Sequence, residues 1–182
     1  MIPLSSAYTR TFTKAQAMGY GVLCALPFLL LIGLGFRFFL SDQAQLMALG
    51  GVQFYLTFII LIAISVTLHE LLHGIGWMLA GHLRWKDIHF HFSAMMPTTC
   101  CEPPLAKRAY LVGVLLPFVV LGLGSSLLLL THPATLTLLA ALVNITLAGA
   151  DLAIAIRIAR EPASARISDH PTLAGYVVNL EK

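Results

Sequence analysis

Four long apolar segments constrain the fold of this chain more than any other feature. They cover residues 18–36, 54–80, 108–130 and 135–158 of a 182-residue sequence in which 58% of the residues are hydrophobic and 10% are charged. Soluble proteins carry charge on roughly a quarter of their residues, and a helix of about 20 apolar residues spans a bilayer. We therefore predict an all-α integral membrane protein with four transmembrane helices, organised as a single polytopic domain over residues 1–182.

The stretch between the second and third predicted helices is the longest polar connection. Within it, Ile88-His89-Phe90-His91-Phe92 alternates apolar and polar side chains, a pattern typical of a β-strand. We expect a small β-strand or hairpin element in this loop. The tail, residues 159–182, is polar, and its Gly175-Tyr176-Val177-Val178 segment is compatible with one more short strand.

The positions of the basic residues predict the orientation of the helices. Ten of the eleven lie before the first helix, between the second and third, or at and beyond the end of the fourth, and only Arg37 lies on the opposite side. Cytoplasmic loops of membrane proteins carry an excess of Lys and Arg. We therefore predict a multi-pass protein of the cell membrane with both termini and the long loop in the cytoplasm. A net charge of +3 distributed in this way does not indicate a nucleic-acid partner.

The second apolar segment contains His69-Glu70-Leu71-Leu72-His73. Two histidines at this spacing project from one face of a helix and can share one tetrahedral Zn²⁺ ion. Glu70 is then placed to accept a proton from a zinc-bound water. Ionisable groups inside an apolar helix are costly and usually functional. The sequence therefore predicts one zinc ion on His69 and His73 with Glu70 as catalytic base, and the alternative is a structural histidine pair with Glu70 as its counter-ion.

Asp151 is the candidate for a third zinc ligand. Apart from Glu70, it is the only acidic residue inside the predicted spans. Both acidic residues lie roughly 10–16 Å from the cytoplasmic ends of their helices, so they share one depth in the membrane. Coordination of a cation would offset the cost of an aspartate in the membrane. The alternative is a hydrogen bond that packs two helices, or a structural pair with a histidine. Because water must reach the site, we expect a polar cleft between the second and fourth helices.

Three further polar residues are candidates for binding substrate or supporting the metal ligands. Asn144 lies two turns before Asp151 on the same helix face. It can bond a substrate carbonyl or the metal shell, and a hydrogen bond between helices explains it equally well. His89 and His91 share one face of the predicted strand, where they can line the entry to the site, and a solvated strand face is the simpler interpretation.

The motif His69-Glu70-Leu71-Leu72-His73-Gly74, followed by Asn144 to Asp151 on a later helix, resembles the site-2 protease type of intramembrane zinc metalloprotease. More closely, the chain resembles a family of small bacterial membrane proteins described as zincin peptidases. This similarity extends over most of the chain and includes Asp169-His170-Pro171 and Gly175 in the tail.

The resemblance implies that His69, His73 and Asp151 bind zinc and that Glu70 is the general base. The site-2 pattern has an asparagine and then a proline before Leu-Asp-Gly. Here no proline stands between the asparagine and the aspartate, and a leucine follows the aspartate. The role of the asparagine and the substrate class therefore do not carry over from the resemblance.

We interpret the chain as an intramembrane zinc metallopeptidase that hydrolyses peptide bonds near the cytoplasmic face of the bilayer. Its substrate would be a membrane protein or peptide whose helix unwinds, and an extended substrate can pair with Ile88–Phe92 by strand addition. Two alternatives remain. One is a non-catalytic membrane protein with a structural or regulatory zinc site. The other is a metal transporter, which the clustering of the ionisable groups in one leaflet disfavours.

Overall fold

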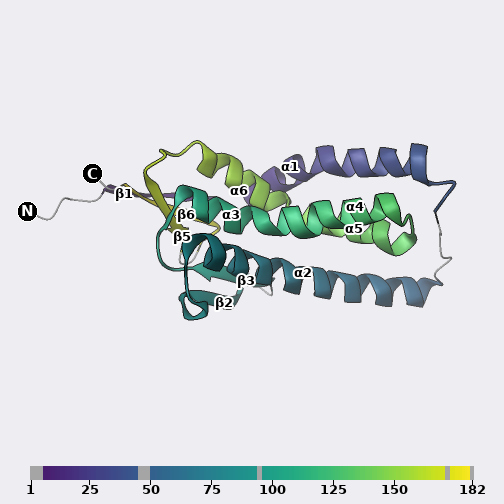
Figure 1. Cartoon of the computed structure of the whole chain (residues 1–182), viewed down its shortest axis with the longest axis horizontal. Helices are drawn as coiled ribbons and strands as arrows, with labels where there is room; N and C mark the ends of the chain where they lie inside the picture. The colour runs from purple at the N-terminus through teal and green to yellow at the C-terminus, as the bar shows by residue number, and fades with distance from the viewer. Residues whose placement is uncertain (1–5, 45–49, 94–95, 171–172, 181–182) are drawn as a thin grey trace, which may run out of the picture.

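Four long helical segments lie side by side, and the described strands gather at one end of them (Figure 1). The computed structural model describes residues 6–44, 50–93, 96–170 and 173–180. Pro171 and Lys182, which entered the sequence predictions, lie outside these ranges. All four helical segments are long and apolar enough to cross a membrane.

The helices agree with the four predicted spans and extend them at several ends. The first segment is α1 (Lys14–Gly35) followed by the π-helical η1 (Phe36–Leu40), and the second is α2 (Gly51–Gly81). The third consists of α3 (Lys107–Pro117), the π-helical η3 (Phe118–Leu123) and α4 (Gly124–Thr131). The fourth is divided into α5 (Thr135–Leu147) and α6 (Gly149–Ala159).

Local chemistry explains where several of these helices begin, end or change. Thr13 and Gln16 cap each other's backbone N–H groups, so α1 begins at Lys14, before the apolar run. His82 takes a left-handed conformation with φ 53° and ends α2. The π-helical turn follows Pro117, whose ring removes a backbone donor and disturbs the α-helical ladder.

The strands form two antiparallel sheets. β2 (Ile88–Ser93) pairs with β3 (Met96–Cys101), which confirms the predicted hairpin. The second sheet has the order β1-β6-β5-β4 and contains the predicted tail strand as β6. Its strands are β1 (Ser6–Thr11), β4 (Leu105–Ala106), β5 (Ala165–Asp169) and β6 (Gly175–Leu180).

The all-α description is therefore incomplete. The helices and the hairpin are as predicted, but the four-stranded sheet joins three segments that are far apart in the sequence. The pairing of β1 with β6 brings the N-terminal and C-terminal segments together at the same end as the hairpin (Figure 1). This arrangement is the one that the predicted topology, with both termini on one side, requires.

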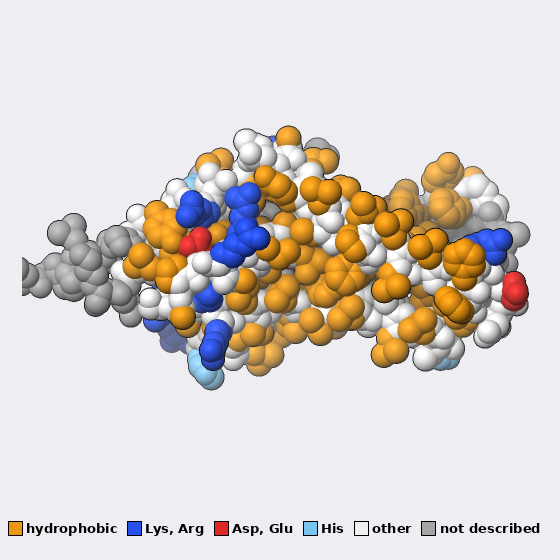
Figure 2. All heavy atoms as spheres, turned by 90° about the horizontal axis from the view of Figure 1, so that it is seen from above, with side chains coloured by type: hydrophobic (Ala, Val, Ile, Leu, Met, Phe, Trp, Pro, Cys, Tyr) orange, Lys and Arg blue, Asp and Glu red, His pale blue; other side chains and the backbone are white. Residues whose placement is uncertain are grey.

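The buried core lies at the strand end, and the helical body is apolar on its outside. Buried residues from α2, α3 and α6 pack there against residues of the sheets, among them Trp77, Tyr110, Ile158 and Tyr176. Figure 2 shows hydrophobic side chains over the helical body and Lys and Arg side chains gathered near the strand end. An apolar surface of this extent suits lipid rather than water, and the basic end suits a membrane–water interface.

The contact between α1 and α6 depends on glycine. A side chain at Gly149 would overlap the carbonyl oxygen of Gly21, which belongs to the backbone of α1 and cannot turn away. We predict that Gly149→Ala lowers the free energy of unfolding by about 1–3 kcal/mol, because the helices must move apart. Thermal unfolding in detergent micelles measures this change.

Gly33→Ala is the matched control, since a side chain there meets nothing within 4 Å. Alanine should leave stability unchanged at this position or raise it by up to about 1 kcal/mol through helix propensity. Equal melting temperatures for the two variants would contradict the close packing of α1 on α6.

Candidate metal centre

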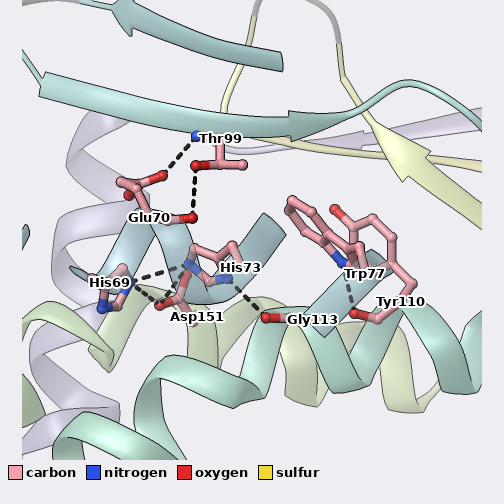
Figure 3. A network of polar contacts seen from close by, with 8 residues as sticks. All are labelled: His69, Glu70, His73, Trp77, Thr99, Tyr110, Gly113 and Asp151. Carbon is pink, nitrogen blue, oxygen red and sulfur yellow. Dashed lines mark hydrogen bonds and ion pairs between the residues drawn. The ribbon is translucent and has the colours of Figure 1, made fainter. Parts of the chain in front are cut away.

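Three ligand atoms from two helices converge in the interior. His69 and His73 lie one turn apart on α2, and their Nε2 atoms are 3.1 Å apart. Asp151 lies in the first turn of α6, with Oδ2 at 2.9 Å from Nε2 of His69 and 3.6 Å from Nε2 of His73 (Figure 3). Ligand atoms on one tetrahedral zinc ion are separated by roughly 3.3 Å, given metal–ligand bonds of about 2.0–2.1 Å. The three atoms therefore have the spacing of one face of a zinc tetrahedron.

The orientation of His73 is set from α3. Nδ1 of His73 lies 2.9 Å from the carbonyl oxygen of Gly113. A carbonyl only accepts, so Nδ1 carries the proton and donates it, and a neutral His73 presents its Nε2 lone pair to His69 and Asp151. This is the tautomer that metal binding requires.

The indole of Trp77 supports this arrangement. Its ring stacks on that of His73 with centroids 5.6 Å apart, and its Nε1 donates to the carbonyl oxygen of Tyr110 at 3.1 Å. A side chain on Gly113 would overlap the indole. Glycine at this position lets α3 approach closely enough for its carbonyl to reach the histidine.

The donor set fits a zinc ion. Both histidines are 7% exposed, and the Asp151 side chain is 16% exposed. Oδ2 of Asp151 is buried, and the Nε2 atoms of the two histidines lie next to it. Two imidazole nitrogens and a carboxylate are the donors that zinc takes in catalytic sites, and a cation among them would compensate the buried negative charge.

Glu70 lies beside these ligands and is held by a strand. Its Oε2 accepts a hydrogen bond from the backbone N–H of Thr99 at 2.6 Å, and its backbone carbonyl accepts one from Oγ1 of Thr99 at 2.9 Å (Figure 3). One ligand atom from each of His69, Glu70 and His73 lies within 4.8 Å of the others. Thr99 thus docks β3 on α2 at the predicted base, a contact for which the sequence carries no signal.

A cavity of about 220 Å³ opens onto the site. It lies between α2, α6, β3 and the segment before β6, and so agrees with the expected polar cleft between the second and fourth helical segments. Its polar lining includes Glu70, His73, Thr99, Asp151 and Asp169.

Asp169 on β5 is a cavity residue that the sequence named only as part of a resemblance. Its Oδ1 accepts from the hydroxyl of Tyr110 at 2.5 Å, and its Oδ2 accepts from the backbone N–H of Cys101 at 2.7 Å. Burial raises the pKa of the Asp169 carboxyl to about 6, against the lowering effect of these two hydrogen bonds. A buried carboxyl on the wall of a reaction cavity is a candidate for a functional role.

The remaining candidate residues lie away from the lining of this cavity. Asn144 is buried on α5, and one turn residue, Ala148, separates that helix from α6, which carries Asp151. His89 and His91 stack their rings in parallel with centroids 6.2 Å apart, and Nε2 of His89 lies 3.5 Å from Oε2 of Glu102. None of these three predicted residues lines the cavity, and their roles stay predictions.

Sequence comparison places the chain in a family. The profile of the family described as Putative zincin peptidase matches residues 62–166, more than half of the chain. The chain belongs to this family. The matched range contains both zincin motif histidines, the glutamate between them and Asp151. No curated protein shows significant similarity to the chain, and neither does any solved structure. Family membership suggests a metallopeptidase, and His69, Glu70 and His73 on α2 form a group that could hold a metal ion.

Removal of Asp151 tests the third ligand. We predict that Asp151→Ala loses its bound zinc, because two imidazoles alone leave the tetrahedral site without an anionic ligand. Elemental analysis of the purified protein should find one zinc ion per wild-type chain and little in the variant. Asp42→Ala, which changes an exposed aspartate outside the cavity, should keep its zinc. Full zinc content in Asp151→Ala would contradict the assignment.

Proposed function

We propose that this protein is an intramembrane zinc metallopeptidase that hydrolyses a peptide bond of a membrane-associated substrate near the cytoplasmic face. One observation carries the proposal. Nε2 of His69, Nε2 of His73 and Oδ2 of Asp151 converge beside Glu70, on helices long enough to cross a membrane. Membership of the zincin peptidase family supports the same chemistry.

In the proposed hydrolysis, three residues would hold the zinc ion and a fourth would transfer the proton. A zinc ion bound by the two histidines and Asp151 would supply the Lewis acidity that polarises the scissile carbonyl and acidifies a bound water. Glu70 accepts the proton of the attacking water and returns it to the leaving amine. The Thr99 amide uses only Oε2 of this carboxylate, so Oε1 remains for the proton.

The number of ligands favours a catalytic site over a structural one. Structural zinc sites in proteins are closed by four protein ligands, whereas catalytic sites have three and keep one position for water or substrate. Here His69, His73 and Asp151 converge, and Glu70 is held at one side by Thr99. The cavity of about 220 Å³ next to them provides the space for a reacting peptide group.

The hairpin is suited to hold an extended substrate. Among the described strands, β2 pairs with β3 alone, so its other edge carries backbone groups without a strand partner. An unwound substrate segment would add to this edge as a further strand, with main-chain hydrogen bonds supplying the affinity. A transmembrane helix that unwinds at its cytoplasmic end is a source of such a segment.

Glu70→Gln is the direct test of the mechanism. The substitution keeps the shape and removes the base, so cleavage should fall by roughly 10²–10⁴-fold while zinc stays bound. Cleavage of an internally quenched peptide library in detergent micelles measures the rate, and elemental analysis measures the zinc. Glu102→Gln, at an exposed glutamate outside the cavity, should cleave like the wild type.

Unchanged cleavage in Glu70→Gln would exclude this glutamate as the base. If the wild-type protein holds zinc, cleaves nothing and moves zinc across proteoliposome membranes, transport would replace proteolysis as the function.

The proposed orientation has its own test. Alkaline phosphatase is active only outside the cytoplasm, so a fusion placed after Asp42, in the connection between α1 and α2, should be active. A fusion placed after Lys182 should be inactive, since the basic end of the bundle faces the cytoplasm. The reverse pattern in the two fusions would invert the topology.

A further inference from the structure

The outer edge of β3 is the edge opposite its partner strand β2, and it faces the cavity. Among the described residues, every backbone N–H group on this edge is hydrogen-bonded. In an antiparallel pair, alternate residues point their backbone N–H groups away from the partner strand. The N–H groups of Thr99 and Cys101 point away from β2, because they bond side chains elsewhere in the protein. Pro97, the preceding residue on the same edge, has no N–H group.

Both outward N–H groups are bonded to carboxylates that line the cavity. Thr99 donates to Glu70, and Cys101 donates to Asp169. The two donors are neighbours on one edge of a short strand, so movement at Cys101 displaces Thr99 as well. Asp169 and Glu70 are therefore connected through two residues on one edge of β3.

A second connection leads from Asp169 to the metal ligands. Its other oxygen accepts from the hydroxyl of Tyr110, whose backbone carbonyl accepts from the indole of Trp77. This indole stacks on the ring of His73 (Figure 3). One carboxylate outside the helical segments thus contacts both the strand that holds the base and the aromatic stack that supports a ligand.

We propose that Asp169 is a positioning residue, which holds Glu70 through the outer edge of β3 and supports His73 through Tyr110 and Trp77. The reaction it serves is the peptide hydrolysis proposed above, and the inference rests on that function. Asp169 touches neither the predicted ligands nor the predicted base, so its effect on the reaction is transmitted by β3 and α3.

Three variants separate positioning from other roles. Asp169→Ala removes both hydrogen bonds. Asp169→Asn keeps the bond that holds β3, because its amide oxygen accepts from Cys101, and reverses the other bond, because its amide nitrogen donates to the oxygen of Tyr110. Glu161→Ala is the matched control: Glu161 also binds two tyrosine hydroxyls, those of Tyr8 and Tyr176, but it contacts neither β3 nor the cavity.

Amide hydrogen exchange tests the connection without any substrate. In Asp169→Ala, the amides of Thr99 and Cys101 should both exchange roughly 10–100-fold faster, which corresponds to loss of a hydrogen bond to a charged group. Asp169→Asn and Glu161→Ala should exchange at the wild-type rate at both positions. Protection of Thr99 in folded Asp169→Ala would overturn the proposal, and so would loss of protection at both amides in Glu161→Ala.

Kinetic measurements then test whether loss of Asp169 slows peptide cleavage. In Asp169→Ala, kcat on the quenched peptide library should fall roughly 10–100-fold with KM unchanged, as expected for a displaced base. Asp169→Asn should restore kcat, and failure of this rescue in a folded variant would overturn a positioning role. If Asp169→Ala does not fold, Tyr110→Phe replaces it. This variant should speed exchange at Cys101, and an unchanged rate there would overturn the proposal.

The two proposals fail in different ways. A wild-type protein that binds zinc and cleaves no peptide would contradict the proposed function, while the exchange rates would still decide whether Asp169 controls the β3 edge. Cleavage by the wild type with equal kcat in Asp169→Ala would keep the peptidase and remove Asp169 from it.

Discussion

The rest of the structure depends on one interaction, the meeting of the Asp151 carboxylate with the Nε2 atoms of His69 and His73 in an apolar interior. A carboxylate is costly to bury unless a cation or hydrogen bonds compensate its charge. The fold brings these groups together through close backbone contacts. Glycine at position 149 allows α6 to pack closely on α1. Glycine at position 113 allows the backbone of α3 to reach the ring of His73. The apolar helices therefore build a site whose buried carboxylate and imidazoles suit a cation.

The part of the protein beyond the helices also shapes the site. β3 reaches Glu70 through Thr99, and β5 reaches β3 and α3 through Asp169. The four-stranded sheet that contains β5 is itself fixed by Glu161, which accepts hydrogen bonds from tyrosines on β1 and β6. The segments at the two ends of the chain thus pair in the sheet whose strand β5 carries Asp169 to the cavity.

Local patterns predicted most of the secondary structure and part of the site. The apolar runs identified the four helical segments, and the alternation of Ile88–Phe92 identified a strand. The helix break at Ala148 had no local signal, because it lies where the fourth segment packs on the backbone of α1. The four-stranded sheet was also missed, since its strands are short and their partners lie far along the chain. The equal depth of Glu70 and Asp151 did suggest that their helices meet.

The sequence by itself determined the apolar spans, the zincin motif and the common helix face of its two histidines, because each depends on residues within a few turns of one another. Tertiary structure decided the rest of the site. The bond between Thr99 and Glu70 joins residues 29 apart, and the bond between Cys101 and Asp169 joins residues 68 apart. No periodicity encodes such pairs. They exist because the packed helices and the two sheets bring separate segments to one cavity, where buried polar groups must find partners.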